Sequence, residues 1–220
     1  MSKKEFNPEK LANEYDNKSP EKIIKLALEN FDNIAISFSG AEDVVLIDIA
    51  KKIDCHSIRI NLRSEEDADI NKILDNSSES ILKLIEYSKN DNVSIVVENH
   101  GGLSSNGKHL ANVMSLVNLD NCGTLPDFGN FCIKGSPKNC NEWYDKYMGV
   151  EELMPYAHAV SAKSYHFDEN GDETSIDYIQ MMDIVKRAGY KGYVGIEYEG
   201  NKLGEDEGII ATKKLLEKLI

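Results

Sequence analysis

The sequence lacks any apolar run of the roughly 18–20 residues that a membrane-spanning helix needs. Its first ten residues, MSKKEFNPEK, also lack the apolar core of a secretory signal. Lysine and arginine are few relative to the acids, 25 against 38, which leaves a formal net charge of −13. Nucleic acids and anionic membranes are bound through clustered basic residues, so this balance argues against both as partners. We therefore expect a soluble, cytoplasmic protein.

Cysteine is also sparse, and the four cysteines form no CxxC pair. They are Cys55, Cys122, Cys132 and Cys140. A structural zinc site usually shows closely spaced cysteine pairs, and disulfides are characteristic of exported proteins. We therefore expect reduced thiols, with neither a disulfide framework nor a structural zinc ion.

At 220 residues the chain can bury a substantial core, and its length fits one domain or a small domain plus a fragment. The first 54 residues have the pattern of a helical ααβα segment. Apolar spacing and capping residues predict helices over 8–17 and 20–30, a strand over 34–38 and a helix over 44–53. A Ser39-Gly40 turn would join this strand to the last helix.

From Cys55 onward the pattern becomes a regular alternation of strands and helices. Short β-branched runs predict strands over 56–62, 93–98, 123–128, 159–165 and 192–199. Amphipathic stretches predict helices over 77–89, 108–117, 175–188 and 205–219, with one or two helical turns within 141–156. The segments 63–76 and 132–141 are expected to be loops. Five successive βα units indicate a parallel sheet with helices outside it.

The alternation of side chains along these strands favours a barrel. In the last strand Val194, Ile196 and Tyr198 share one face. Glu197 and Glu199 share the opposite face. A doubly wound sheet is apolar on both faces, whereas the mouth of a (β/α) barrel is polar inside. The sequence therefore predicts an α/β fold of the TIM-type barrel.

We expect this barrel to be incomplete. Five parallel strands follow Cys55, and the strand over 34–38 could add a sixth, whereas a closed TIM barrel needs eight. A sheet that stays open presents unpaired strand edges, and such edges can support self-association.

Three of the predicted strands end in a carboxylate followed closely by glycine. The carboxylates are Glu98 in SIVVENHGG, Asp127 in TLPDFGN and Glu197 in YVGIEYEG. Because the carboxyl ends of parallel strands meet at one rim, we expect these acids to converge. Their hard oxygens favour Mg²⁺ or Mn²⁺, and Co²⁺ or Zn²⁺ are also compatible. The sequence therefore predicts a divalent metal site.

At these residues the chain resembles a known family. Residues 55–220 are similar to the xylose-isomerase-like TIM barrels, in particular the sugar phosphate isomerase/epimerase group. The matching stretches are CHSIRINLRSE, VVENHGGLSS, CGTLPDFGNF, GVEELMPYAHAVSAKSY and GYVGIEYEG. The resemblance implies a metal-dependent isomerase or epimerase that moves a proton next to a carbonyl through an enediolate, with a sugar or sugar phosphate as its small-molecule substrate.

In that family a divalent ion at the barrel mouth is held by Glu, Asp, His and Glu from four successive strands, and two of the carboxylates also move protons. The resemblance assigns Glu98, Asp127 and Glu197 to three of these ligands. The histidine position falls at Ser161, which is a departure from the family pattern, and Lys163 is nearby as an inward cation.

The implied roles follow from this assignment. Glu98 and Glu197 are the candidates for proton transfer, and Lys163 is the candidate for neutralising the enediolate oxygen. Candidate substrate-binding residues are Arg59, Asn61, Arg63, His100, Asn130 and Glu199.

The N-terminal part resembles a different family. The stretch NKSPEKIIKLALENFDNIAISFSGAEDVVLIDIA, within residues 13–54, is similar to the N-terminal part of phosphoadenylyl- and adenylyl-sulfate reductases. The resemblance implies that Ser37, Ser39 and Gly40 belong to a phosphate-binding loop, here a weak one because the rest of the pocket is absent. We therefore expect a reductase-like fragment over 1–54 and a partial barrel over 55–220.

Two readings of the function remain open at this point. The chain is either an isomerase or epimerase, or a degenerate or chimeric fusion that does not catalyse and at most binds nucleotide phosphate weakly. Glu98 could instead form a structural salt bridge, and Asp127 could serve an Asx turn before Gly129. Sulfonucleotide reduction is rejected because no catalytic cysteine motif follows Cys140.

Overall fold

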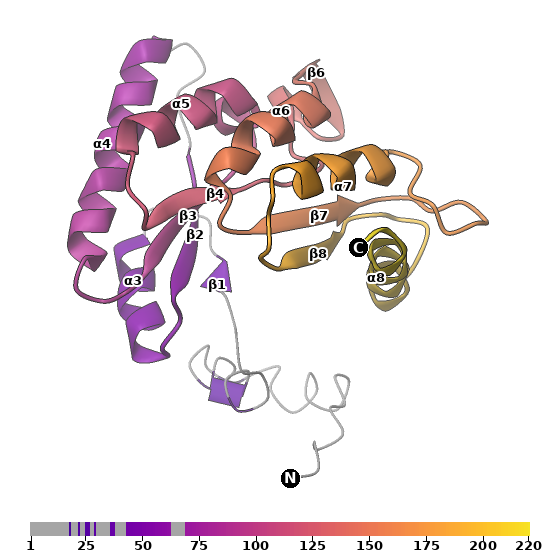
Figure 1. Ribbon diagram of the computed structural model, residues 1–220, viewed down its shortest axis with the longest axis horizontal. Coiled ribbons are helices and arrows are strands. Elements are labelled where there is room, and N and C mark those ends of the chain that lie inside the picture. Colours follow the sequence, from indigo (N-terminus) through magenta and orange to yellow (C-terminus); the bar gives the residue numbers. More distant parts are fainter. Residues whose placement is uncertain are drawn as a thin grey trace.

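The computed structural model describes residues 18, 22, 25, 26, 29, 36–37, 43–62 and 69–220. Within them, six parallel strands form the centre of the fold, as Figure 1 shows. Their bounds are β1 (Ile36–Ser37), β2 (Ser57–Asn61), β3 (Ser94–Glu98), β4 (Cys122–Leu125), β7 (Val160–Ser164) and β8 (Val194–Tyr198). The predicted α/β fold with five to six parallel strands is confirmed.

The six strands form a four-stranded and a two-stranded parallel sheet that adjoin each other. Strands β1 to β4 pair in sequence order, and β7 pairs with β8. The two groups meet where the chain after β4 runs beside β7, through the parallel bridges Thr124↔Ala157 and Asp127↔Ser161. Here the Phe128 backbone N–H donates to the Ser161 carbonyl at 3.1 Å. In the described part of the chain no pairing joins β8 back to β1, so the sheet is open between them.

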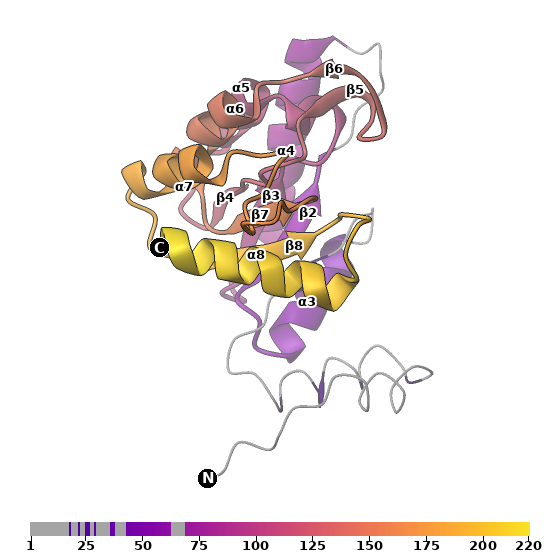
Figure 2. The same ribbon diagram turned by 90° about the vertical axis from the view of Figure 1, so that its right-hand side faces the viewer.

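Helices cover the outer side of this sheet (Figure 1). They are α3 (Asp43–Lys52), α4 (Ile70–Ser88), α5 (Gly107–Val117), α6 (Lys146–Leu153), α7 (Tyr178–Arg187) and α8 (Glu205–Leu219), with short 3₁₀ turns η1 (Gly102–Ser105) and η2 (Met154–Tyr156). Figure 2 shows α8 lying along β8. Four helices begin after a capping side chain that accepts a backbone N–H three residues on, at Asp69, Asn106, Asp145 and Asp177. Each cap satisfies a donor that the first helical turn leaves unpaired.

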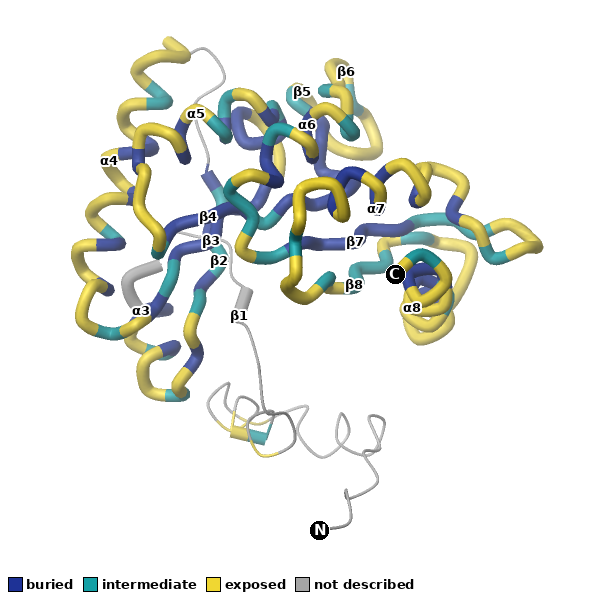
Figure 3. Tube along the Cα trace, in the orientation of Figure 1, coloured by how far each residue is buried: buried dark blue, intermediate teal, exposed yellow. Residues whose placement is uncertain are grey.

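Two apolar clusters fill the space between sheet and helices. In the first, α3, α4 and α5 pack on β2 to β4, with Ile47, Ile81 and Ile95 fully buried. In the second, α6, α7 and α8 surround β7 together with Phe128 and Phe131. Figure 3 shows that the buried positions lie along the strands and the inner faces of the helices. Because α3 contributes to the first cluster, part of the N-terminal segment shares a core with the barrel strands.

One segment differs from the expectation. A hairpin of β5 (Cys132–Ser136) and β6 (Asn139–Trp143) replaces the predicted loop over 132–141. Cys132 and Cys140 form a disulfide across this hairpin, so the prediction of four reduced thiols was wrong. The antiparallel pairing brings their Cα atoms to 5.8 Å, within the range that a disulfide spans. Cys122 is a buried thiol, as expected.

The bounds of α3, α5, α7 and α8 lie within three residues of the prediction, whereas α4 differs more. This helix begins at Ile70, whereas the sequence predicted a start at residue 77, because the Asp69 carboxylate caps it by accepting the Lys72 N–H at 3.1 Å. The predicted helix over 8–17 lies outside the described residues. No helix in the described part of the chain is long and apolar enough to cross a membrane.

Candidate metal centre

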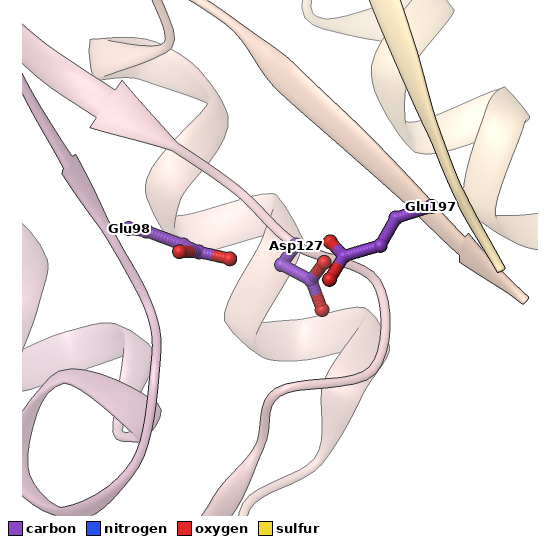
Figure 4. A group of neighbouring side chains, drawn as sticks. All are labelled: Glu98, Asp127 and Glu197. Carbon is purple, nitrogen blue, oxygen red and sulfur yellow. The ribbon is translucent and has the colours of Figure 1, made fainter. Parts of the chain in front are cut away.

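The three carboxylates predicted to converge do lie together. Glu98 is the last residue of β3, Asp127 follows β4 and Glu197 lies on β8. One oxygen of each lies within 4.8 Å of the others. Figure 4 shows Asp127 between the other two side chains, at the carboxyl ends of the strands. The rim of the sheet therefore carries a cluster of three acids that are far apart in the sequence.

Asp127 is fixed on every side. It is fully buried. Its Oδ1 accepts the backbone N–H groups of Gly129 at 2.8 Å and Asn130 at 2.9 Å, which is the Asx turn that the sequence allowed. Its Oδ2 accepts the Ser161 hydroxyl at 2.8 Å. This hydroxyl also lies 3.0 Å from Glu197 Oε2, so Ser161 bridges two of the acids.

Lys163 lies among the same acids, with a side chain only 1% exposed. Its Nζ is 3.2 Å from Glu197 Oε1, 3.2 Å from Glu199 Oε2 and 3.9 Å from Asp127 Oδ2. It also donates to Asn130 Oδ1 at 3.0 Å. The ammonium is thus surrounded by oxygen atoms and takes no part in apolar packing at its tip.

Glu98 has its own cation. The Arg59 guanidinium donates to Glu98 Oε2, which is the salt bridge considered as an alternative from the sequence. Asn130 Nδ2 donates to the other oxygen, Oε1, at 3.2 Å. Asn130 therefore links Glu98 on one side of the cluster to Lys163 on the other.

The pKa values of the neighbouring acids Asp127 and Glu197 are shifted in opposite directions. Burial raises the pKa of Asp127 to about 7, although the Lys163 ammonium opposes this shift. Burial acts in the same direction on Glu197, but Lys163 and the Ser161 hydroxyl outweigh it and lower the pKa of that carboxyl. Burial also works against the charged form of Lys163, yet Asp127, Glu197 and Glu199 raise its pKa, so the side chain stays an ammonium. Carboxyls with divergent pKa values are typical of acid–base sites.

The remaining predicted substrate residues are partly placed. Asn61 and Glu98 are paired neighbours on adjacent strands, and Arg59 donates to Asn61 Oδ1 at 2.9 Å. His100 is exposed at the rim, where partial burial and the charge of Arg59 lower the pKa of its ring. Glu199 is exposed beside Lys163. Arg63, Ser39 and Gly40 lie outside the described residues, and the side chain of Ser37 does too.

Two donors at this rim lack a partner among the described residues. Arg59 Nε and Asn61 Nδ2 are buried and make no hydrogen bond within that part of the chain. A buried donor without an acceptor is costly, by about 1–3 kcal/mol. Both atoms belong to side chains on the inward face of β2, beside Glu98. They are therefore well placed to donate hydrogen bonds to an oxygen atom of a ligand.

Sequence reasoning missed Asn99, which is fully buried. Its Oδ1 accepts the Asp127 N–H at 2.7 Å, and its Nδ2 donates to the carbonyls of Asp127 and Asn130. The signal was an amide directly after the strand-terminal Glu98. Gly129 is a second such residue, because a Cβ there would lie 2.5 Å from Tyr165 Oη and 2.9 Å from Lys163 Cδ.

The donor set suits a divalent ion. Among the described residues, four carboxylates at the rim pair with two cations, Arg59 and Lys163, and these six groups carry a formal charge of −2 when all the acids are ionised. An ion such as Mg²⁺ holds oxygens at about 2.0–2.1 Å, and carboxylate oxygens within 4.8 Å of one another can reach this with small side-chain movements.

Comparison with known proteins agrees with this architecture. The family model described as "Xylose isomerase-like TIM barrel" matches residues 44–219. The chain belongs to this family. The match starts within α3, so the family pattern includes part of the segment before Cys55.

Solved structures of xylose isomerase-like barrels share the fold. The IOLI protein with a bound zinc atom superposes with a TM-score of 0.68 at 14% identity, covering 96% of this chain and 84% of that one. A D-tagatose 3-epimerase-like protein superposes with a TM-score of 0.65 at 18% identity, covering 91% of this chain and 83% of that one. A Mycobacterium smegmatis barrel in complex with magnesium gives 0.60 at 17% identity, covering 92% and 79%.

Curated relatives match shorter stretches. A C-glycoside deglycosidase alpha subunit from Arthrobacter globiformis is 37% identical over 76 residues, 33% of this chain and 20% of that protein. A 3'-dehydrocarminate deglycosidase alpha subunit from Microbacterium sp is 40% identical over 48 residues, which are 22% of this chain and 14% of that protein. An adenosine 5'-phosphosulfate reductase from Pseudomonas aeruginosa is 52% identical over 50 residues, 22% and 19%. The matches thus span a fifth or less of the length of these relatives.

Proposed function

We propose that the protein is a metal-dependent sugar or sugar phosphate isomerase/epimerase that moves a proton on the carbon next to a carbonyl, through an enediolate. The observation that carries the proposal is the convergence of Glu98, Asp127 and Glu197 within 4.8 Å. The likeness to a D-tagatose 3-epimerase-like protein supports the same reaction class.

Glu98, Asp127 and Glu197 would hold the ion, with Mg²⁺ or Mn²⁺ favoured by the three hard oxygens and Co²⁺ or Zn²⁺ compatible. When bound, such an ion polarises a carbonyl and stabilises negative charge on its oxygen. The hydroxyl of Ser161, at the family's histidine position, lies within hydrogen-bond distance of both Asp127 and Glu197, and its one proton, shared between them, keeps the two carboxylates turned toward the cluster.

The proton transfers fall to Glu98 and Glu197, which lie on opposite sides of Asp127 (Figure 4). One removes the proton from the carbon next to the carbonyl and the other returns a proton to the adjacent carbon or the opposite face. Such acid–base steps contribute about 10²–10⁴-fold each. Lys163 neutralises the negative oxygen of the enediolate, and its ion pairs keep it protonated for that role.

Substrate oxygens would be held along β2 and the neighbouring loops. The donors Arg59 Nε and Asn61 Nδ2, which have no partner in the described part of the chain, suit a hydroxyl or carbonyl oxygen. Asn130, His100 and Glu199 add further polar groups around the same rim. An open-chain sugar has an oxygen on nearly every carbon and can satisfy several of these groups at once.

The test is proton exchange. Purified protein with Mn²⁺ is incubated in D₂O with a panel of ketoses and ketose phosphates, and deuterium at the carbon next to the carbonyl is followed by NMR. We expect exchange in the wild type, a loss of about 10²-fold or more in Glu98→Gln and Glu197→Gln, and no loss in Glu79→Gln. Glu79 is an exposed partner of Lys83 on α4 and serves as the matched control.

Binding of Mn²⁺ is measured separately by calorimetry. We expect wild type to bind and Glu98→Gln to bind more weakly. Equal Mn²⁺ binding by wild type and Glu98→Gln, or exchange that persists in both glutamine variants, would contradict the proposed site.

A second candidate function uses the same proton abstraction for an elimination. Its support is the identity with the two deglycosidase subunits, one of which has a "3'-dehydro" substrate in its name, meaning a ketone on the sugar. Removal of the proton next to a 3-ketone forms an enolate. Breaking the bond from C1 to the aglycone then expels the aglycone with the electron pair, which a proton neutralises, and leaves an unsaturated keto sugar. Release of aglycone from a 3-keto C-glucoside, without exchange on ketoses, favours this candidate over epimerisation.

The reading without catalysis is supported by a different observation, the 50-residue match to the reductase. It treats residues 1–54 as a reductase-like fragment joined to a partial barrel over 55–220, with weak phosphate binding at Ser37, Ser39 and Gly40. Binding of adenosine 5'-phosphosulfate together with absence of Mn²⁺ binding and of proton exchange would favour it.

A further inference from the structure

Each acid that would hold a metal ion already has a protein cation beside it. Arg59 pairs with Glu98, and Lys163 lies 3.2 Å from Glu197 and 3.9 Å from Asp127. The two cations differ in how far their side chains are exposed to solvent. The Arg59 side chain is 18% exposed, whereas that of Lys163 is 1% exposed and is enclosed by the cluster itself.

The Lys163 ammonium is held among the acids by contacts along its whole length. Its stem passes Gly129 so closely that a single added Cβ there would lie 2.9 Å from Lys163 Cδ. At the tip, Asn130 Oδ1 accepts a hydrogen bond at 3.0 Å, and Glu199 holds the side that faces solvent at 3.2 Å. An ion that enters the cluster would therefore share Asp127 and Glu197 with a fixed positive charge.

We propose that Lys163 is a resident counter-ion that competes with the divalent ion for Asp127 and Glu197, so that it holds the acids together when no ion is bound and weakens the binding of the ion. This inference rests on the metal site of the proposed function and adds how that site is regulated. Two cations a few ångströms apart repel each other strongly inside a protein, where the effective dielectric constant is about 20. Without either cation, the acids would repel one another instead.

The proposal has two consequences of opposite sign for one substitution. Removing the ammonium leaves Asp127 and Glu197 as neighbouring, partly buried acids with no cation, which destabilises the metal-free protein. The same substitution removes the repulsion against the ion and strengthens its binding. A lysine that served only to stabilise the fold would show the first effect without the second.

The experiment compares wild type, Lys163→Met and Lys163→Gln, with Lys134→Met as the control. Lys134 is an exposed lysine on β5 whose Nζ lies 3.1 Å from Glu142 Oε2. It therefore also pairs with a carboxylate, but at a solvent-exposed position. Mn²⁺ affinity is measured by calorimetry, and thermal unfolding is followed with and without Mn²⁺. The Gln variant keeps a hydrogen-bond donor toward Asn130 and is the milder of the two.

We expect both Lys163 variants to bind Mn²⁺ at least about tenfold more tightly than wild type. Without the ion, both should unfold at a lower temperature than wild type. Addition of Mn²⁺ should raise their unfolding temperature more than it raises that of wild type. If a variant folds only when Mn²⁺ is supplied during purification, the ion has replaced the ammonium, which supports the proposal. Lys134→Met should match wild type in both measurements.

Three results would overturn the counter-ion proposal. The first is unchanged or weaker Mn²⁺ binding in the folded Lys163 variants. The second is a metal-free stability equal to that of wild type, and the third is failure of Mn²⁺ to restore the stability of either variant. If wild type and both variants fail to bind Mn²⁺ at all, the metal site of the proposed function is lost as well, so the two failures are distinguishable.

Discussion

Lys163 and Glu197 are paired neighbours on β7 and β8, and their side chains meet with Nζ 3.2 Å from Oε1. The parallel register therefore places a cation directly beside a candidate metal ligand. A shift of this register by one residue would turn either side chain to the opposite face of the sheet. The pairing of two strands thus sets the charge balance at the rim.

Ser161 occupies a position from which a longer side chain could reach an ion held by Asp127 and Glu197. Its hydroxyl lies 2.8 Å from Asp127 Oδ2 and 3.0 Å from Glu197 Oε2. We expect Ser161→His to raise Zn²⁺ affinity by about tenfold, because imidazole is a stronger ligand for zinc than a hydroxyl. Calorimetry with Zn²⁺ checks this. Ser161→Ala, which adds no ligand, should show no gain, and an equal gain in both variants would contradict the prediction.

Asn99 ties the chain after β4 to the end of β3. Asn99→Ala leaves the Asp127 N–H and two carbonyls without the side chain that they contact. We expect a loss of about 1–3 kcal/mol in the free energy of unfolding, measured by urea titration. Mn²⁺ affinity should fall about tenfold or more, since the substitution frees a ligand-bearing loop.

The control for that variant is Asn141→Ala on the exposed strand β6. Surface substitutions of this kind change stability by about 0.5 kcal/mol or less. A loss of stability at Asn99 with unchanged Mn²⁺ affinity would show that the loop is held by other contacts.

Gly129 is required by the close approach of two side chains. In Gly129→Ala the new methyl group would lie 2.5 Å from Tyr165 Oη and 2.9 Å from Lys163 Cδ. We expect a loss of about 1–3 kcal/mol in the free energy of unfolding, as for other overpacked sites. Adding Tyr165→Phe removes the nearer atom and should restore part of the loss in urea titrations. A double variant no more stable than Gly129→Ala would rule out this collision as the cause.

Cys122 should resist alkylation in the folded protein. Burial raises the pKa of its thiol from 9.0 to about 12, so almost no thiolate forms at pH 8. The unfolded chain loses this proton at lower pH, so the stability from this thiol is present below about pH 9 and is lost as the pH rises toward 12. Iodoacetamide labelling followed by mass spectrometry should modify Cys122 only after denaturation. Labelling at equal rates before and after denaturation would contradict the burial.

Much of the architecture could be predicted from local patterns. The β-branched runs around Val96 and Ile196 predicted strands, and the amphipathic spacing over 205–219 predicted α8 at its observed bounds. The convergence of Glu98, Asp127 and Glu197 followed from one rule, that parallel strands end at a common rim. Such inferences succeed because each depends on a periodicity of the chain itself.

The parts that could not be predicted depend on contacts between distant residues. The strands of the β5–β6 hairpin are short and polar, and apolar and polar residues do not alternate clearly along them. The sequence therefore did not predict the disulfide between Cys132 and Cys140. The hydrogen bonds of Asn99 are equally invisible, since they join it to a loop 28 residues away. The predicted start of α4 is wrong because apolar spacing alone does not show the cap that Asp69 provides.

The open sheet has a consequence for how the site is assembled. Among the described residues, the arc from β3 to β8 supplies Glu98, Asp127, Glu197 and Glu199, and β1 supplies none of these acids. Closure of the ring between β8 and β1 is therefore not needed to bring the four carboxylates to one rim. The geometry of the acids depends on the pairing of neighbouring strands and of the chain after β4 with β7.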